Sequence, residues 1–412
     1  MDDDIQLDLV VFGGTSFVGQ ILCRRLAATF GVDGPLRWGA AGRSHRKLQD
    51  LRASLGPHAA DLHLIVADAT DEEALRQLCE STKVVVSTVG PFALYGETLV
   101  KVCAETGTDY CDLAAEVHWI RRMIDSYEPA AKASGARIVH GCGFDSIPSD
   151  LGVHFLQRHA EERFGRPCSQ VKMRVKALRG KASGGSVASL MNVTAEAARN
   201  RALRRELANP YALTPREEAP ETRQPSLSGV KFDHDFGGWT APYVMAGTNT
   251  RIVHRTNALS DFAYGEDFVY DEAVLTGRGV RGRLAAFVMA SALRSFLIAT
   301  ALRPTRWLLK RYMVPAPGEG PSPEAQKNGF YDLRFLGTGD DGEVLRAKLV
   351  GAGDPGYAST SKILAHTGAL LALDLPKSEK PGGFWTPATL FGDRLIDLLH
   401  NRAGLKFELL PG

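Results

Sequence analysis

A glycine-rich turn close to the N-terminus joins two segments of different periodicity. The apolar run at residues 9–12 has strand character, and the apolar residues at 18–27 recur at helical spacing. Between them, Gly13, Gly14 and Gly19 punctuate the string GGTSFVG. A strand, a tight turn and a helix in this order are typical of a dinucleotide fold, in which glycines let the backbone approach the pyrophosphate at the helix N-terminus.

One position of this turn departs from the usual glycine pattern. Ser16 stands where the middle glycine is normally found. Its hydroxyl could donate to a phosphate oxygen, whereas its Cβ limits how near the backbone can come. Taken alone, the turn is equally typical of an ordinary strand-to-helix connection, so its interpretation depends on the rest of the chain.

Strand-like and helical segments alternate through the first third of the chain. We expect strands at residues 9–12, 36–41, 62–67, 84–88, 110–113 and 137–140, with helices such as 72–79, 97–104 and 120–133 between them. Alternation of this kind predicts a parallel sheet covered on both faces. The sequence therefore predicts an α/β protein with an N-terminal Rossmann domain, a doubly wound parallel sheet whose ligand lies beyond the carboxyl ends of its strands.

Length, charge and cysteine usage narrow the class of protein. A chain of 412 residues should form two domains. A net charge of +2 without a dense basic run argues against nucleic acid as a partner. The six cysteines are scattered without a CxxC pair, and His154 and His159 lie on different faces of a helix, so we expect no metal site. The acidic N-terminus lacks a secretory signal, which favours a cytoplasmic location.

The segments that follow the predicted second and third strands indicate the type of dinucleotide. The string AGRSHRKL supplies Arg43, Ser44 and Lys47, and no carboxylate stands where an NAD enzyme would bind the ribose 2′-hydroxyl. Cationic donors suit a 2′-phosphate, so we predict NADP(H) rather than NAD. After the third strand, Asp68 is a candidate for the adenine edge, and Thr70 is the expected N-cap of the next helix.

The predicted fourth strand leads to the nicotinamide half of the site. A stiff turn at Thr88, Val89, Gly90 and Pro91 could hold the nicotinamide ribose, and Tyr95 follows within reach as a candidate proton donor. Further along, Asp145 and Ser146 would orient substrate or cofactor. The other acids near these strand ends are more typical of caps and turns, namely Asp109, Asp112, Glu116 and Asp150.

Several strings in the same order resemble one family. GGTSFVG, AGRSHRKL, STVGPFALYG, GTDYCDLAAE and GFDSIPSDLG, with SGGSVAS, NTRIVHRTNAL and GDPGYASTSKILAHTGALLAL later in the chain, resemble the saccharopine-dehydrogenase-like oxidoreductases. The likeness is closest to the trans-acting enoyl reductases of polyketide-lipid synthesis. It implies an NADP-binding domain, an inserted α/β substrate domain, and reduction by NADPH of a carbon–carbon double bond on a carrier-bound acyl chain.

The resemblance also assigns cofactor positions. Gly13, Gly19, Arg43 and Asp68 match those of the family, and Ser16 replaces its more usual glycine. Together with the strand-end analysis, this gives one predicted cofactor-binding set: Gly13, Gly14, Thr15, Ser16, Phe17, Val18, Gly19, Arg43, Ser44, Lys47, Asp68, Thr88, Val89, Gly90 and Pro91.

The rest of the chain divides less cleanly. We expect an NADP-binding domain at residues 1–150, a substrate domain with a mixed sheet at 151–352, and C-terminal helices at 353–412 that return to the first domain. The string SGGSVAS could direct the backbone amides of Gly184 and Gly185 at a substrate, or could simply cap a helical run at 190–205. The two C-terminal helical strings read as amphipathic.

An apolar segment at residues 284–312 distinguishes this chain from an amino-acid dehydrogenase, whose small polar substrate would not require such a segment. Arg294 and Pro304 argue against a membrane span, which leaves an acyl-binding wall, an interfacial helix or a buried core helix. Basic residues on both sides favour contact with anionic lipid or an acidic carrier. This charge pattern is compatible with a peripheral location at the inner face of the membrane and with a polyketide synthase as partner. A homo-oligomer is a further alternative.

Three functions remain open at this stage. The first is an NADPH-dependent enoyl reductase that acts in trans on carrier-bound or lipid acyl chains. The second is a saccharopine-type amino-acid dehydrogenase, which would need cationic pockets for two or three carboxylates. The third is a non-catalytic NADP-binding protein that works at a lipid surface.

Overall fold

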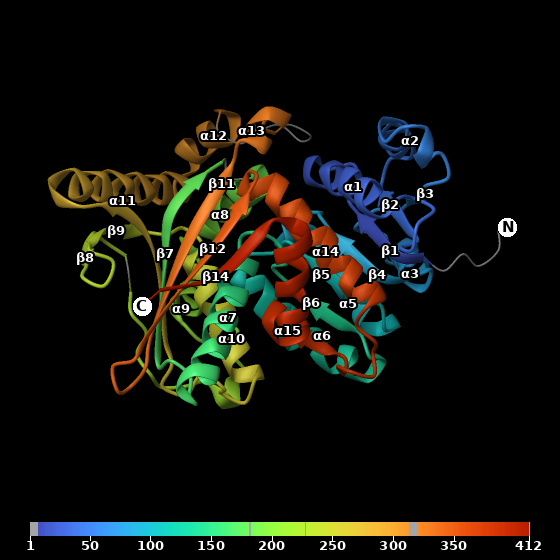
Figure 1. Cartoon of the computed structure of the whole chain (residues 1–412). Helices are drawn as coiled ribbons and strands as arrows, with labels where there is room; N and C mark the ends of the chain where they lie inside the picture. Colours follow the sequence, from blue (N-terminus) through green and yellow to red (C-terminus); the bar gives the residue numbers. More distant parts are fainter. Residues whose placement is uncertain (1–6, 181–182, 227, 313–319, 412) are drawn as a thin grey trace.

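Two seven-stranded sheets organise the part of the chain described by the computed structural model, residues 7–180, 183–226, 228–312 and 320–411. The first sheet and its helices lie on the right of Figure 1, the second sheet lies on the left, and helices of the middle and C-terminal parts of the chain fill the space between them. This arrangement confirms the predicted fold class.

The first sheet is parallel throughout, in the order β13-β6-β5-β4-β1-β2-β3. Its strands are β1 (Leu7–Phe12), β2 (Trp38–Gly42), β3 (His63–Val66), β4 (Thr82–Ser87), β5 (Asp109–Asp112), β6 (Arg137–Val139) and β13 (Gly383–Trp385). The helices that connect them are α1 (Phe17–Phe30), α2 (His45–Ser54), α3 (Glu72–Glu80), α4 (Phe92–Tyr95), α5 (Glu97–Thr106) and α6 (Val117–Ser134). The strand order reverses between β1 and β4, where a doubly wound sheet binds its ligand.

The second sheet is mixed, in the order β14-β12-β11-β7-β10-β9-β8. Its strands are β7 (Gln170–Arg179), β8 (Lys231–Asp233), β9 (Gly238–Pro242), β10 (Val269–Gly277), β11 (Phe330–Thr338), β12 (Val344–Ala352) and β14 (Leu405–Leu410). β7 and β10 are parallel, and the other neighbours are antiparallel. The end of the chain therefore joins the second sheet, whereas β13 joins the first.

The remaining helices cover the second sheet or lie between the two sheets. They are α7 (Ile147–Phe164), α8 (Gly184–Ala197), α9 (Arg201–Ala208), α10 (Ala246–Leu259), α11 (Gly279–Ala301), α12 (Arg303–Tyr312), α13 (Pro323–Lys327), α14 (Thr360–Leu373) and α15 (Pro387–Leu398). The continuous helical run predicted at 190–205 is wrong, because α8 ends at Ala197 and Asn200 caps a separate helix, α9, by accepting from the Leu203 amide at 3.1 Å.

Two further local predictions are corrected. Thr70 is not the cap of α3, because the carboxylate of Asp71 accepts from the Ala74 amide at 3.1 Å and fills that position. α14 is not amphipathic but buried on nearly all sides. It crosses the first sheet so closely that a Cβ on Gly368 would come within 2.8 Å of Leu9 and Val86 side-chain atoms, and a helix enclosed in this way presents no polar face.

The apolar segment at 284–312 is not a buried core helix. It forms most of α11 and α12, which lie along the top of the molecule in Figure 1. Only 11% of the most apolar window of α11 is buried, although its length and composition would suffice to cross a membrane.

Candidate functional site

A cavity of about 1420 Å³ opens at the carboxyl ends of the first sheet's strands. One side is formed by the segments that follow β1, β2, β3 and β4. The opposite side is formed by α8, by the residues after β9 and by Leu297 of α11. The cavity thus extends from the switch point of the parallel sheet into the second half of the chain.

At two positions of the N-terminal turn, only glycine fits, because a Cβ atom would clash with neighbouring protein atoms. Gly13 has a φ of +87°, and a Cβ there would lie 2.6 Å from Val89 Cγ2. A Cβ on Gly19 would lie 2.1 Å from the Gly13 carbonyl oxygen. The first glycine therefore brings the turn against the end of β4, and the second packs α1 closely against the turn.

Ser16 is the N-cap of α1 and also joins two turns. Its Oγ accepts from the Gly19 amide at 2.9 Å and lies 3.0 Å from Thr88 Oγ1, which in turn donates to the Gly13 carbonyl at 3.0 Å. Either hydroxyl can be the donor of the Ser16–Thr88 bond. The serine hydroxyl therefore joins the start of α1 to the turn after β4, and its donation to a phosphate stays a prediction.

Two basic residues, Arg43 and Lys47, line the cavity after β2. Ser44 and Asp68 line the cavity beside them. The carboxylate of Asp68 accepts from the Thr70 amide at 2.9 Å and the Thr70 hydroxyl at 2.7 Å. These bonds, with a smaller effect of the Arg43 charge, hold the pKa of Asp68 below its usual value. Arg43 and Lys47 are exposed and suit a 2′-phosphate.

These two regions fit NADP(H) as a pair. The glycine turn and the start of α1 line one part of the cavity, where the amides of a helix N-terminus suit a diphosphate, and the exposed cationic side chains of Arg43 and Lys47 line a neighbouring part beside the start of α2. Within the predicted cofactor-binding set, Gly13, Thr15, Ser16, Phe17, Val18, Arg43, Ser44, Lys47, Asp68, Thr88, Val89, Gly90 and Pro91 line the cavity, whereas Gly14 and Gly19 lie behind its surface.

The turn predicted to bind nicotinamide is supported by a carboxylate that the sequence analysis grouped with caps and turns. Oε1 of Glu116 accepts from the Phe92 amide at 3.1 Å and from the Ser189 hydroxyl at 2.8 Å. Burial raises the pKa of Glu116, against the lowering effect of the bond from Ser189. Glu116 thereby joins the start of α4, just after the cis Gly90–Pro91 peptide, to α8.

Three tyrosines line the cavity, Tyr95, Tyr243 and Tyr357. The phenol oxygen of Tyr357 accepts from the Gly184 amide at 3.0 Å. Tyr95 is the last residue of α4, and 46% of its surface is exposed. Tyr243 follows β9 and is half-buried; its burial raises the pKa of the phenol well above the usual value, and the charges of Glu272 and Asp145 raise it further. The sequence analysis missed Tyr243, because nothing local marked β9 as a strand that ends at the cavity.

The two other predicted catalytic residues differ in placement. Asp145 lines the cavity, accepts from the Ser186 hydroxyl at 3.2 Å, and has a pKa raised by burial. Ser146 is fully buried outside the cavity lining, and its Oγ has no hydrogen-bond partner among the described residues. The structure therefore brings Tyr95 and Asp145 to the site but not Ser146.

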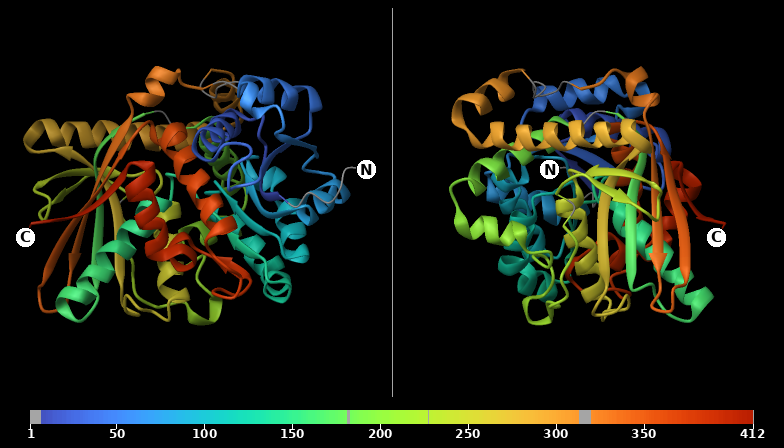
Figure 2. Two further views of the ribbon diagram at one scale, coloured as in Figure 1. Left: turned by 45° about the vertical axis from the view of Figure 1, so that its right-hand side comes forward. Right: turned by 90° about the vertical axis from the view of Figure 1, so that its left-hand side faces the viewer.

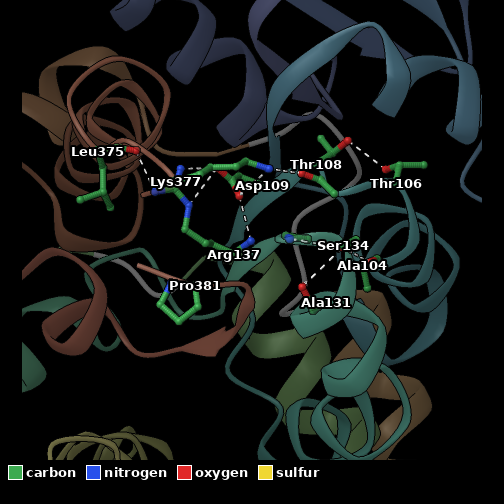
Figure 3. A network of polar contacts seen from close by, with 12 residues as sticks. Ala104, Thr106, Thr108, Asp109, Ala131, Ser134, Arg137, Leu375, Lys377 and Pro381 are labelled. Carbon is green, nitrogen blue, oxygen red and sulfur yellow. Dashed lines mark hydrogen bonds and ion pairs between the residues drawn. The ribbon is translucent and has the colours of Figure 1, made fainter. Parts of the chain in front are cut away.

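The remaining acids of these strand ends have structural partners. Asp112 accepts from Tyr110 at 3.0 Å and the Ala114 amide at 2.9 Å, and lies 2.8 Å from His140 Nδ1. Figure 3 shows Asp109 paired with Arg137, whose guanidinium also donates to the Leu375 carbonyl at 2.7 Å. Within the described residues, no group of three or more His, Cys, Asp or Glu side chains is arranged to hold a metal ion.

The far part of the cavity is apolar. Its lining includes Val187, Leu190, Val193, Leu207, Met245 and Leu297. Among the described residues that line the cavity, the basic ones are Arg43 and Lys47 alone, and both lie at the cofactor end. An acyl chain fits this lining, whereas a substrate with several carboxylates would meet no cation there.

Comparisons with known proteins agree with this geometry. Residues 9–139 match the family model described as the saccharopine dehydrogenase NADP binding domain. The trans-acting enoyl reductase of Mycobacterium tuberculosis is 37% identical over 405 residues, with 95% of each chain covered, and that of Mycobacterium ulcerans is 36% identical over 402 residues, again with 95% of each chain covered. A second M. tuberculosis protein, provisionally named for the same activity, is 38% identical over 403 residues, covering 96% of this chain and 95% of the other.

A solved structure supports the fold over the whole chain. The saccharopine dehydrogenase (L-Glu forming) of Saccharomyces cerevisiae superposes with a TM-score of 0.55 at 14% identity, covering 98% of this chain and 99% of the other.

Proposed function

Because this chain belongs to the family of the trans-acting enoyl reductases, we propose that it reduces the double bond of an enoyl thioester on a long acyl chain that a separate synthase presents. It is an NADP-dependent oxidoreductase with a saccharopine dehydrogenase NADP-binding domain. The predicted family and cofactor are thereby confirmed; the acyl-carrier form of the substrate is part of the proposal.

The observation that carries the proposal is the lining of the cavity beyond the cofactor end. It consists of apolar and hydroxyl side chains with Glu116 and Asp145, and its described part contains no lysine, arginine or histidine. A saccharopine-type substrate would bring several carboxylates next to these acids without a cation to pair with them. The lining therefore favours an acyl chain over an amino dicarboxylate.

The side chains at the inner end divide the work of the reaction. NADPH, when bound, supplies the hydride that is added at the β-carbon of the enoyl group. Tyr95 donates the proton to the α-carbon; its exposed hydroxyl can be reprotonated from water after each turnover. Tyr243, kept protonated by its raised pKa, donates a hydrogen bond to the thioester oxygen as negative charge develops there.

Glu116 and Asp145 act on these groups indirectly. Glu116 anchors the start of α4 through the Phe92 amide, which holds Tyr95 beside the turn at 88–91. Asp145, hydrogen-bonded to Ser186, borders the same inner region. In this scheme both are positioning residues rather than proton donors.

The test follows NADPH oxidation with trans-2-enoyl thioesters of increasing chain length and, in parallel, NADPH formation from NADP+ with saccharopine-type substrates. We expect turnover of the enoyl thioesters. The kcat of Tyr95→Phe should be lower by about 100-fold or more, and the kcat of Tyr243→Phe should fall by a similar factor. Tyr127→Phe is the matched control, because Tyr127 bonds Glu97 at 3.2 Å outside the cavity lining. Oxidation of saccharopine-type substrates alone would replace the proposal with the amino-acid dehydrogenase, and NADPH binding without any turnover would support the non-catalytic alternative.

A further inference from the structure

The exposed face of α11 and α12 carries large apolar side chains that no described part of the chain covers. Val280, Leu284, Phe287, Ile298 and Leu302 are 84%, 62%, 63%, 57% and 53% exposed. Their spacing along the helix places them in one stripe. Trp307 and Leu308 of α12, the helix that follows, are also exposed, at 65% and 47%. We call these seven residues the apolar stripe.

The opposite face of α11 fastens the helix to the protein along its length. Gly282, Ala286 and Thr300 are buried, and the helix packs against β9, β10 and α8. Figure 2 shows α11 lying along the outside of the molecule in both views. A helix held in this way, with Arg294 exposed in its middle, is suited to lie on a surface and not to cross a membrane.

The charge around the apolar stripe has one sign. Between residues 273 and 318 the sequence contains eight basic residues and no acidic one, whereas the whole chain has a net charge of only +2. Arg278, Arg281, Arg283, Arg294 and Arg303 are exposed along this surface. Long arginine side chains beside an apolar face can reach lipid phosphates while the apolar groups enter the acyl region.

We propose that the apolar stripe docks this protein, as a peripheral protein, on an anionic lipid bilayer. Exposed apolar side chains, a tryptophan and flanking arginines without acids together match the chemistry of the interface of such a bilayer. The proposal rests on this surface and does not depend on the reaction assigned to the cavity.

A second copy of the chain is a poorer occupant for the same surface. In a two-fold dimer, each stripe would face its own copy, so the arginines of both protomers would be brought together with no acidic residue in the segment to pair with them. An anionic bilayer supplies the complementary charge.

Docking would also bring the bilayer close to the apolar part of the cavity. Leu297 lies on the inner side of α11 and lines the cavity together with Val187, Leu190 and Val193 of α8. In the docked protein, only the layer formed by α8 and α11 would separate an acyl chain in the bilayer from the cavity.

The proposal is tested by co-sedimentation of the full chain with vesicles of phosphatidylcholine, with or without about one third phosphatidylglycerol. We expect binding to the anionic vesicles, weakened when sodium chloride rises from about 0.1 M to about 1 M. Phe287→Ser with Ile298→Ser should lower the bound fraction about tenfold or more. Arg281→Glu with Arg294→Glu and Arg303→Glu should do the same.

Matched controls use exposed residues elsewhere on the molecule. Val344→Ser with Leu409→Ser removes exposed apolar groups from β12 and β14 of the second sheet, and Arg223→Glu with Arg402→Glu reverses exposed charges outside the segment. Both should bind vesicles like the unmodified protein, and all variants should retain NADPH binding, which reports on folding.

Three results would overturn the proposal. The first is no binding to anionic vesicles at low salt, and the second is equal binding by the stripe variants and the controls. The third is an absence of vesicle binding combined with a different use of the stripe. That use would be either a dimer in the absence of lipid, which the stripe variants convert to monomers, or binding to an acyl-carrier domain that depends on the stripe. Enoyl reductase activity on soluble short-chain thioesters, measured in the same preparations, shows separately whether the proposed reaction holds.

Discussion

Arg43 is the side chain on which we expect the choice between NADPH and NADH to depend most directly. It lines the cofactor end of the cavity and is exposed, so it can turn to a 2′-phosphate without breaking a buried contact. A charge-assisted hydrogen bond of this kind is worth about 1.5–3 kcal/mol. We expect Arg43→Ala to weaken NADPH binding by about tenfold or more and to leave NADH binding nearly unchanged.

The neighbouring arginine provides the control for that measurement. Arg46 lies three residues after Arg43, in the first turn of α2, and is exposed but does not line the cavity. Arg46→Ala should keep the preference for NADPH in a titration followed by fluorescence. If both variants lose the preference equally, the effect belongs to the general positive charge of α2 and not to a contact made by Arg43.

At Gly13, we expect the addition of a single Cβ atom to prevent NADPH binding. An alanine there would have a positive φ and a Cβ 2.6 Å from Val89. We expect Gly13→Ala to abolish detectable NADPH binding. Gly135→Ala isolates the backbone cost, because Gly135 has a φ of +82° with no atom within 4 Å of its Cβ position. That variant should lose only about 1 kcal/mol of unfolding free energy and bind NADPH normally; an equal effect on binding would contradict the close approach seen here.

At the scale of elements, Asp150 ties three helices together. It lies in the first turn of α7, accepts from the Thr256 hydroxyl of α10 at 2.5 Å, and accepts from the Ala388 amide of α15 at 2.8 Å. Burial raises the pKa of Asp150 to about 7, and the two hydrogen bonds lower it only in part. The sequence analysis treated this residue as support for a helix, and the structure extends that role to two further helices.

The raised pKa predicts how stability changes with pH. The folded state holds a proton on Asp150 up to about pH 7, whereas the unfolded chain releases it near pH 4, so this contribution is complete below about pH 4 and is lost as the pH rises through 7. Relative to Asp150→Asn, we expect the unfolding free energy of the unmodified protein to fall by about 2.5 kcal/mol from pH 5 to pH 8.

Denaturant titrations of both proteins at several pH values check this slope. The difference between them removes the contributions of His254 and His366, whose pKa values burial lowers to about 3 and about 4 and which act in the opposite direction. A difference that stays constant with pH would mean that Asp150 is ionised in the folded protein.

At the scale of the whole molecule, the two sheets share one core. A single hydrophobic cluster includes Leu9 of β1, Phe155 of α7, and Met173 and Phe335 of the second sheet. α7 lies against β11 so closely that a Cβ on Gly152 would be 2.2 Å from the Phe335 ring. A continuous core of this kind favours cooperative unfolding of both sheets.

Phe335→Ala tests that cooperativity. Truncating this buried ring should cost about 3–5 kcal/mol. The midpoint seen by far-UV circular dichroism and the midpoint for loss of NADPH binding should then fall together, although Phe335 is remote from the cofactor end of the cavity. Leu373→Ala, at an exposed position on α14, should move neither by much. Two separate transitions in Phe335→Ala would show that the sheets unfold independently.

The sequence by itself determined six of the seven strands of the first sheet, the glycine turn and the basic residues that follow β2, whereas β13 joins that sheet from the C-terminal part of the chain. Strand and helix periods, the glycines of the turn and the absence of an acid near Arg43 are local properties that can be recognised within a few residues of sequence. Predicted strand limits differ from the observed ones by no more than two residues, since side-chain patterns mark strand interiors better than strand ends.

Only the tertiary structure decided which side chains meet in the cavity and which face of α11 remains exposed. Tyr243 enters the site from the second sheet, and Glu116 gains its role by contacting both α4 and α8, whereas Ser146 turns away although it follows Asp145 directly. The composition of α11 is that of a core helix, yet its stripe from Val280 to Leu302 is exposed. Burial and polar contacts depend on segments distant in sequence, so no local pattern could specify them.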